Sequence, residues 1–130
     1  MKADVHWVDD THSVLCCRFS GEWDWNVFYA TIEQPTLFNE PHDPCLMIDL
    51  RGVPRMPIDM VLHLKRAVQL TLEVKGMTVL IATSAGAATM YQMLTMVYKP
   101  LAAKMRLVSS EEEAYAVLGF VPETPPQTFI

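Results

Sequence analysis

The sequence predicts an α/β fold in which strands and helices alternate around a mainly parallel sheet of four to five strands. Two apolar runs, beginning at Cys45 and Met77, are each followed by a stretch of helical period. Two shorter strand-like segments lie close together near the N-terminus, as in a hairpin. With 130 residues, 51% of them hydrophobic, the chain suits a single domain. We therefore expect the order ββαβαβαβα, with about four helices and an antiparallel N-terminal hairpin at the sheet edge.

The first elements follow from local patterns. Residues 4–8 and 13–19 are predicted to be the strands of the hairpin, because the DDTH sequence between them has turn composition. Asp24 can cap a helix that begins immediately after it. Its core-facing stripe recurs at i, i+3, i+4 and i+7 and consists of Trp25, Phe28, Tyr29 and Ile32. An extended loop is then expected around Pro35, Pro41 and Pro44.

The middle of the chain predicts two central strands and a helix between them. Residues 45–50 are apolar except for Asp49, which is typical of a strand covered on both faces. Residues 77–83 have the same character. The helix is expected from 59 to 75, with Leu62 and Leu70 off its buried stripe. That stripe is predicted to consist of Met60, Val61, Leu64, Ala67, Val68 and Leu72.

The remaining elements are a third helix over 84–98, a short strand over 104–108 and a final helix capped by Ser109 or Ser110. In the third helix Met90, Met93, Leu94 and Val97 share one face, which favours core packing. The proline-rich residues 122–130 predict an extended or disordered tail, so the domain is expected over 1–121.

Composition excludes several classes of function. The formal net charge of −5 provides no basic surface for nucleic acid. The adjacent Cys16 and Cys17 would point to opposite faces of a strand, and three cysteines in all suit a reducing cytoplasm. The uncharged run from Gly76 to Tyr98 is long enough to cross a bilayer, but its Thr, Ser and Gln residues favour a chain without membrane insertion. No export signal is visible, and we expect a cytoplasmic protein.

The run MIDLRGVPRMPIDMVLHL, residues 47–64, resembles the central strand, the Asp-Leu-x-Gly-Val exit and the following helix of the STAS family. This family includes sulfate transporter domains and bacterial anti-sigma factor antagonists. The resemblance extends from Val5 to Leu118 and includes Trp23-x-Trp25 and the EEA opening of the final helix. It implies a STAS-like fold and a regulatory function through protein contacts.

The resemblance also implies a missing switch. In the family, a Ser or Thr at the start of the helix is phosphorylated by a partner kinase that is also an anti-sigma factor. Here residues 56–59 are Met, Pro, Ile and Asp, so no hydroxyl is present. Pro54 and Pro57 are expected to stiffen the loop, and Asp59 to cap the helix. A permanent imitation of the phosphorylated state by Asp59 is the alternative, although one carboxylate carries less charge than a phosphate.

The crevice beyond the carboxyl ends of the parallel strands is the default ligand site of such a fold. Two arginines, a serine and a helix N-terminus there could bind a small anionic or amphiphilic, lipid-like ligand. The alternative is structural: the aspartate and Arg51 pair with nearby groups or solvent, the serine caps the third helix, and the glycine permits close packing. The residues expected to line the crevice are Asp49, Arg51, Arg55, Thr83, Ser84 and Gly86.

Four residues are candidates for a surface that binds a protein partner or a second copy of the chain. They are the off-stripe Trp23, Leu70 and Met96, together with Asp59 of the loop. The leading hypothesis is therefore a non-enzymatic, STAS-like interaction domain that needs no cofactor. The second is the ligand-binding function above.

Enzymatic signals are absent from the sequence. There is no Ser-His-Asp pattern, phosphate-binding loop or dinucleotide fingerprint, and the histidines and cysteines lack metal-ligand spacing. A third hypothesis is an enzyme without a motif, which would use Asp49, His63 or Cys45.

Overall fold

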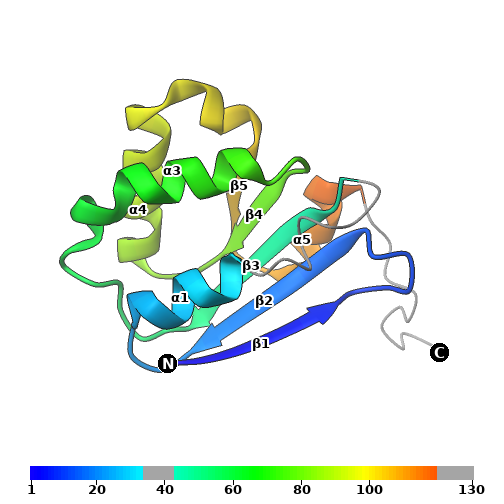
Figure 1. The fold of residues 1–130 in the computed structure, drawn as a ribbon, viewed down its shortest axis with the longest axis horizontal. Helices are drawn as coiled ribbons and strands as arrows, with labels where there is room; N and C mark the ends of the chain where they lie inside the picture. Colours follow the sequence, from blue (N-terminus) through cyan, green and yellow to red (C-terminus); the bar gives the residue numbers. More distant parts are fainter. Residues whose placement is uncertain (34–42, 120–130) are drawn as a thin grey trace.

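A five-stranded sheet forms the centre of the computed structural model, which describes residues 1–33 and 43–119 (Figure 1). The strands lie in chain order. β1 pairs antiparallel with β2, and all other neighbours are parallel, so the predicted mixed sheet is confirmed. The strands are β1 (Lys2–Trp7), β2 (Val14–Ser20), β3 (Cys45–Gly52), β4 (Thr78–Ile81) and β5 (Met105–Val108). Pro35, Pro41, His42 and the predicted tail at 122–130 lie outside the described residues.

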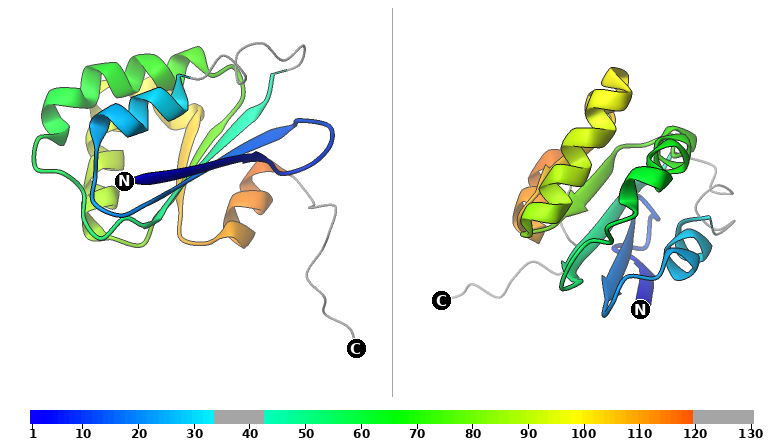
Figure 2. Two further views of the ribbon diagram at one scale, coloured as in Figure 1. Left: turned by 60° about the horizontal axis from the view of Figure 1, so that its bottom comes forward. Right: turned by 90° about the vertical axis from the view of Figure 1, so that its left-hand side faces the viewer.

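Helices cover the two faces of the sheet unequally. Three pack on one face and one, α5, on the other, as the left view of Figure 2 shows for α1, α3 and α5. The helices are α1 (Trp25–Ile32), α3 (Leu64–Glu73), α4 (Ala85–Val97) and α5 (Glu111–Leu118), with 3-10 turns η1 (Met60–His63) and η2 (Lys99–Ala103). The order ββαβαβαβα is confirmed. No helix in the described ranges is long and apolar enough to span a membrane, since Gly76 to Tyr98 is divided between β4 and α4.

The alternation of side chains along the strands produces two separate cores. In β3, Leu46 and Ile48 join the larger core beneath α1, α3 and α4, while Met47 joins the smaller core beneath α5. Cys16 and Cys17 of β2 likewise fall into opposite cores, as predicted. The sheet is therefore buried on both faces at its centre.

Three helix starts follow the predicted cap chemistry. The side chains of Asp24, Ser84 and Ser110 each accept a hydrogen bond from backbone N–H groups just inside α1, α4 and α5. Of the two serines considered for α5, Ser110 is the cap. Ser109 Oγ instead donates to Glu113 Oε1 at 2.7 Å.

The predicted buried stripe of the 59–75 helix is wrong at both ends. Val61 and Leu72 are 58% and 40% exposed, whereas Leu70 is buried at 8% and Thr71 at 9%. The first part of the predicted helix is the 3-10 turn η1. A 3-10 helix has three residues per turn instead of 3.6, so the buried face of the α-helix does not continue back into η1. Leu70 is thus a core residue and not part of an exposed surface.

The last turn of α4 also departs from the prediction. Met90 and Leu94 are buried, but Val97 is 61% exposed. The end of α4 projects beyond the sheet in the right view of Figure 2, so its final residue has no core to face. Met96, in the same turn, is 76% exposed.

Candidate functional site

The 54–62 segment connects β3 to α3 and presents apolar side chains to solvent. Ile58 is 101% exposed, Leu62 82% and Val61 58%. This segment occupies the position after the Asp-Leu-x-Gly-Val exit at which the STAS resemblance places a switch. The sequence analysis identified the segment, but it assigned Val61 to the core and did not expect the exposure of Ile58.

Contacts from two neighbouring elements hold the 54–62 segment from behind. The indole Nε1–H of Trp25 in α1 donates a hydrogen bond of 2.9 Å to Asp59 Oδ1. At the start of α4, Gly86 faces the Met56 side chain, and a Cβ added at this glycine would be in ordinary van der Waals contact with it, at 3.4 Å. The predicted cap by Asp59 is wrong, because its side chain makes no cap hydrogen bond and binds Trp25 instead.

An aromatic cluster beneath the segment contains a Tyr-His-Asp arrangement. The rings of Trp25 and His63 stack with centroids 3.9 Å apart and planes 9° from parallel. The Tyr29 hydroxyl and His63 Nδ1 are 2.6 Å apart, and His63 Nε2 lies 3.7 Å from Asp59 Oδ2. Burial raises the pKa of Tyr29, which is only 5% exposed, so its hydroxyl is not an activated nucleophile. The cluster therefore holds Asp59 of the segment against α1.

Beside the segment is an open groove of about 320 Å³. Arg55 and Glu22 lie across it with Nη2 and Oε1 3.8 Å apart, and both side chains are more than 80% exposed. Trp23, also on the groove, is half-buried against Trp25 and Phe28, with ring centroids 5.0 Å away in each case. Trp23 thus packs against the larger core and also lines the groove.

A cluster of four charged side chains lies on the α5 face of the sheet. Asp49, whose side chain is 3% exposed, accepts hydrogen bonds from Arg51 Nε at 3.0 Å and Nη2 at 2.8 Å, and from Arg18 Nε at 3.2 Å. Glu111 Oε1 at the start of α5 accepts from Nη2 of both arginines, at 2.6 Å from Arg18 and 3.1 Å from Arg51. Sequence analysis missed Arg18 and Glu111, since nothing local links them to Asp49.

The protonation of Asp49 is determined by opposing effects. Burial alone would favour its neutral form, but the hydrogen bonds and positive charge of Arg51, with the bond from Arg18, outweigh burial and lower the pKa of Asp49. The carboxylate is therefore ionised and satisfied by its neighbours. For Asp49 and Arg51, this agrees with the structural alternative stated in the sequence analysis, in which they pair with nearby groups.

The structure does not unite the six residues expected to line one crevice. Asp49 and Arg51 line an open groove with Lys2 and Arg18, whereas Arg55 lines the separate groove beside the 54–62 segment. The others surround the start of α4: Ser84 caps the helix, Gly86 lies against Met56, and Thr83 is exposed. The two arginines therefore do not share a groove that could hold one anion.

Cys16 and Cys17 lie buried in the two cores of the sheet. Burial raises the pKa of Cys16 to about 11 and that of Cys17 to about 12, so both thiols stay protonated at neutral pH. Cys45 opens β3 and packs against the smaller core. Within residues 1–33 and 43–119, no group of three or more His, Cys, Asp or Glu side chains could hold a metal ion.

Comparison with known proteins identifies the architecture. No family model and no curated protein sequence matches the chain. Among solved structures, it is similar to the anti-sigma factor antagonist SpoIIAA in its unphosphorylated form, with a TM-score of 0.60 and 17% sequence identity. The match covers 92% of this chain and 99% of that one. At this identity the likeness establishes the fold alone: the chain has the STAS-like fold that its central motif resembles.

Proposed function

We propose that this chain is a non-enzymatic, STAS-like regulatory domain that binds a protein partner through the 54–62 segment. The observation that carries this proposal is the exposure of Ile58, Val61 and Leu62 on a segment held in place by contacts from behind. Adjacent exposed apolar side chains are typical of surfaces that another protein covers. SpoIIAA, whose fold this chain shares, is described as an antagonist of an anti-sigma factor.

The fixed position of the segment favours binding. A loop that is already ordered loses less conformational freedom when a partner covers it, so more of the contact energy contributes to affinity. Here Trp25 restrains Asp59, while Pro54 and Pro57 restrict the backbone. Burial of Ile58 and Leu62 by a partner would then provide most of the affinity.

The proposed surface works without a phosphorylation switch. Residues 53–63 contain no Ser, Thr or Tyr. The nearest anionic group, Asp59, already accepts the Trp25 N–H, and one carboxylate has less charge and fewer acceptors than a phosphate. We therefore favour a surface that is constitutively available over one that imitates the phosphorylated state.

A pull-down from native cells tests this function with two matched variants. The double variant Ile58→Ser, Leu62→Ser should reduce partner capture at least about tenfold, because it removes the central apolar contacts. Its stability should change by no more than about 0.5 kcal/mol, since both side chains are exposed. Met96→Ser changes another exposed apolar residue, 76% exposed on α4, and serves as the control.

The same experiment separates the alternatives. Loss of the partner with Met96→Ser, and not with the double variant, would move the interaction to the end of α4. Light scattering of the wild-type chain at several concentrations shows whether the captured partner is a second copy. A phosphorylated residue elsewhere in the chain that controlled capture would refute the absence of a switch.

A further inference from the structure

Two arginines on the α5 face of the sheet converge on one oxygen atom. Arg18 belongs to β2 and Arg51 to β3, and the Nη2 atoms of both donate to Glu111 Oε1, at 2.6 Å and 3.1 Å. Glu111 is the first residue of α5, so the oxygen that the arginines share comes from a third element. The chain itself therefore places a carboxylate oxygen between two guanidinium groups.

The buried carboxylate of Asp49 fixes both guanidinium groups from behind. The Asp49 side chain is 3% exposed and accepts hydrogen bonds from Nε of Arg18 and from Nε and Nη2 of Arg51. These bonds restrict the two long side chains in the absence of any ligand. A ligand that binds them therefore orders little that is not already ordered, which favours its affinity.

Both guanidinium groups keep donors that the described part of the chain does not use. An arginine side chain has five N–H donors. Within residues 1–33 and 43–119, no hydrogen bond involves the Nη1 atoms of Arg18 and Arg51. The two side chains are 46% and 36% exposed, so a molecule in solution can reach both. Guanidinium groups with free donors are well suited to a carboxylate, whose two oxygens accept in parallel.

An open groove of about 600 Å³ adjoins the two arginines, which is a volume typical of small-molecule sites. Lys2 at the start of β1 is exposed and also lines the groove. Asp4 brings an opposing charge, on a side chain that is 70% exposed. With Glu111 moved aside, three basic side chains would face the carboxylates of Asp4 and Asp49. One negative charge on a ligand would then balance the groove.

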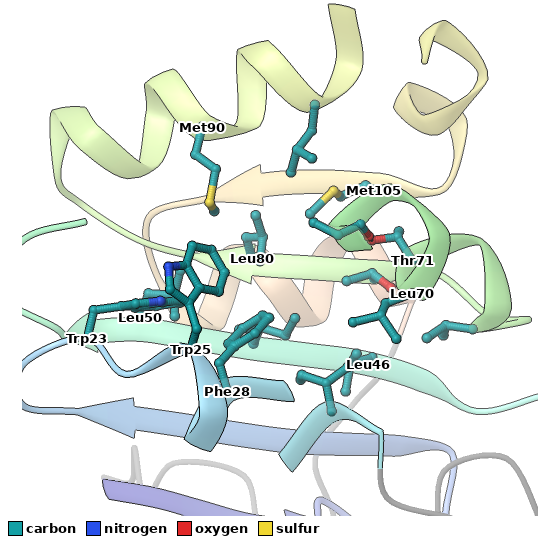
Figure 3. Close-up of a pocket in the computed structure, with 16 residues that line it drawn as sticks. Trp23, Trp25, Phe28, Leu46, Leu50, Leu70, Thr71, Leu80, Met90 and Met105 are labelled. Atoms are coloured by element: carbon teal, nitrogen blue, oxygen red, sulfur yellow. The ribbon is translucent and has the colours of Figure 1, made fainter. Parts of the chain in front are cut away.

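The opposite face of the sheet is unsuited to an anion. Between that face and helices α1, α3 and α4 lies an internal space of about 40 Å³, and the side chains that line it are all uncharged (Figure 3). A charged group there would be desolvated without any opposite charge to compensate. The α5 face, by contrast, places fixed positive charges beside open solvent.

We propose that Arg18 and Arg51 form a binding site for the carboxylate of a small organic molecule, which takes the place of Glu111 between the two guanidinium groups. Glu111 acts as an internal competitor. Its carboxylate is 36% exposed, and exposed ion pairs contribute little free energy, so a ligand can displace it. The site differs from the crevice expected from the sequence, because Arg18 replaces Arg55 as the second arginine. It does not rest on the proposed partner binding at the 54–62 segment.

Titration of the full chain with sodium acetate at constant ionic strength, followed by NMR, tests the site. The Nε–H signals of Arg18 and Arg51 should shift saturably. Acetate has few atoms to make contacts, so we expect a dissociation constant in about the millimolar range. The Nε–H signal of Arg55, which lines the separate groove beside the 54–62 segment, should stay constant. Acetamide, which has the same number of non-hydrogen atoms but no charge, should not bind.

Matched variants test the competitor and the arginines. Glu111→Gln should bind acetate about twofold to fivefold more tightly than wild type, because it weakens the internal competitor. Arg18→Gln should weaken acetate binding at least about tenfold, while Arg51 keeps Asp49 paired. Arg55→Gln removes an equal charge from the separate groove and should change binding by no more than about twofold. Unchanged spectra elsewhere would show that each variant is folded.

Four results would overturn the proposal. They are the absence of a saturable shift with acetate, an equal response to acetamide, equal weakening by Arg18→Gln and Arg55→Gln, and no gain in affinity with Glu111→Gln. If Arg18→Gln is not folded, the acetamide and Glu111→Gln arms decide the question, because both test the same site without changing an arginine.

Discussion

The two faces of the sheet place their polar groups in opposite environments. On the face beneath α1, α3 and α4, the lining is uncharged, and the buried hydroxyl of Thr78 has no hydrogen-bond partner among residues 1–33 and 43–119. On the face beneath α5, a carboxylate that is equally inaccessible has a full set of donors from two arginines. Burial alone therefore does not predict whether a polar group is satisfied.

The difference follows from how much of each face a helix covers. The short α5 covers part of its face, and the carboxyl ends of β2 and β3 emerge there beside an open groove that Arg18 and Arg51 can reach from water. Their side chains stay 46% and 36% exposed, so only Asp49 is fully desolvated. Beneath the other helices the side chains that line the space are all uncharged.

The largest expected change in stability comes from removing Asp49 from the charged cluster. Asp49→Ala removes the acceptor of both arginines and should lower the free energy of unfolding by about 2–4 kcal/mol in urea denaturation. Glu22→Ala, which removes the exposed carboxylate near Arg55, should change it by no more than about 0.5 kcal/mol. Similar losses for the two variants would show that burial of Asp49 contributes nothing.

The contribution of Asp49 to the free energy of unfolding should also depend on pH. Because the pKa of Asp49 is lower in the folded chain than its unfolded value of about 3.9, its stabilisation is present above that unfolded value. It is lost as the pH falls through the lower folded pKa. The stability difference between wild type and Asp49→Ala should therefore shrink below about pH 4, and a constant difference would contradict this assignment.

A smaller effect of opposite sign is expected on the other face. Thr78→Val removes an unpaired buried hydroxyl and should raise the free energy of unfolding by about 1 kcal/mol. Thr71→Val breaks the bond to the Ala67 carbonyl and should lower it by a similar amount. Thermal unfolding of the ligand-free chain measures both. A loss of stability in both variants would mean that the Thr78 hydroxyl is satisfied.

The smallest effect should come from Glu111, the exposed carboxylate of the charged cluster. Glu111→Gln weakens the bonds to Arg18 and Arg51 but leaves Asp49 paired, and Glu111 is 36% exposed. We expect a loss of about 0.5–1 kcal/mol that diminishes at high salt. A loss as large as that of Asp49→Ala would show that the exposed and buried carboxylates contribute equally.

The candidate site could be predicted only in part. The Asp-Leu-x-Gly-Val exit located the 54–62 segment, and cap chemistry correctly placed Ser84. The exposure of Ile58 could not be predicted, because it depends on how Trp25 and α4 hold the segment. Arg18 was missed as a partner of Asp49 because 31 residues separate them along the chain.

The sequence by itself determined the order of the elements, the two central strands and the caps at Asp24 and Ser84. These depend on periodicity and hydrogen bonds within a few residues, which local composition encodes. Only the tertiary structure decided the rotation of α3 that buries Leu70, the partners of Asp49 and the isolation of the Thr78 hydroxyl. Each depends on surfaces that meet when distant segments pack, so no local pattern contains them.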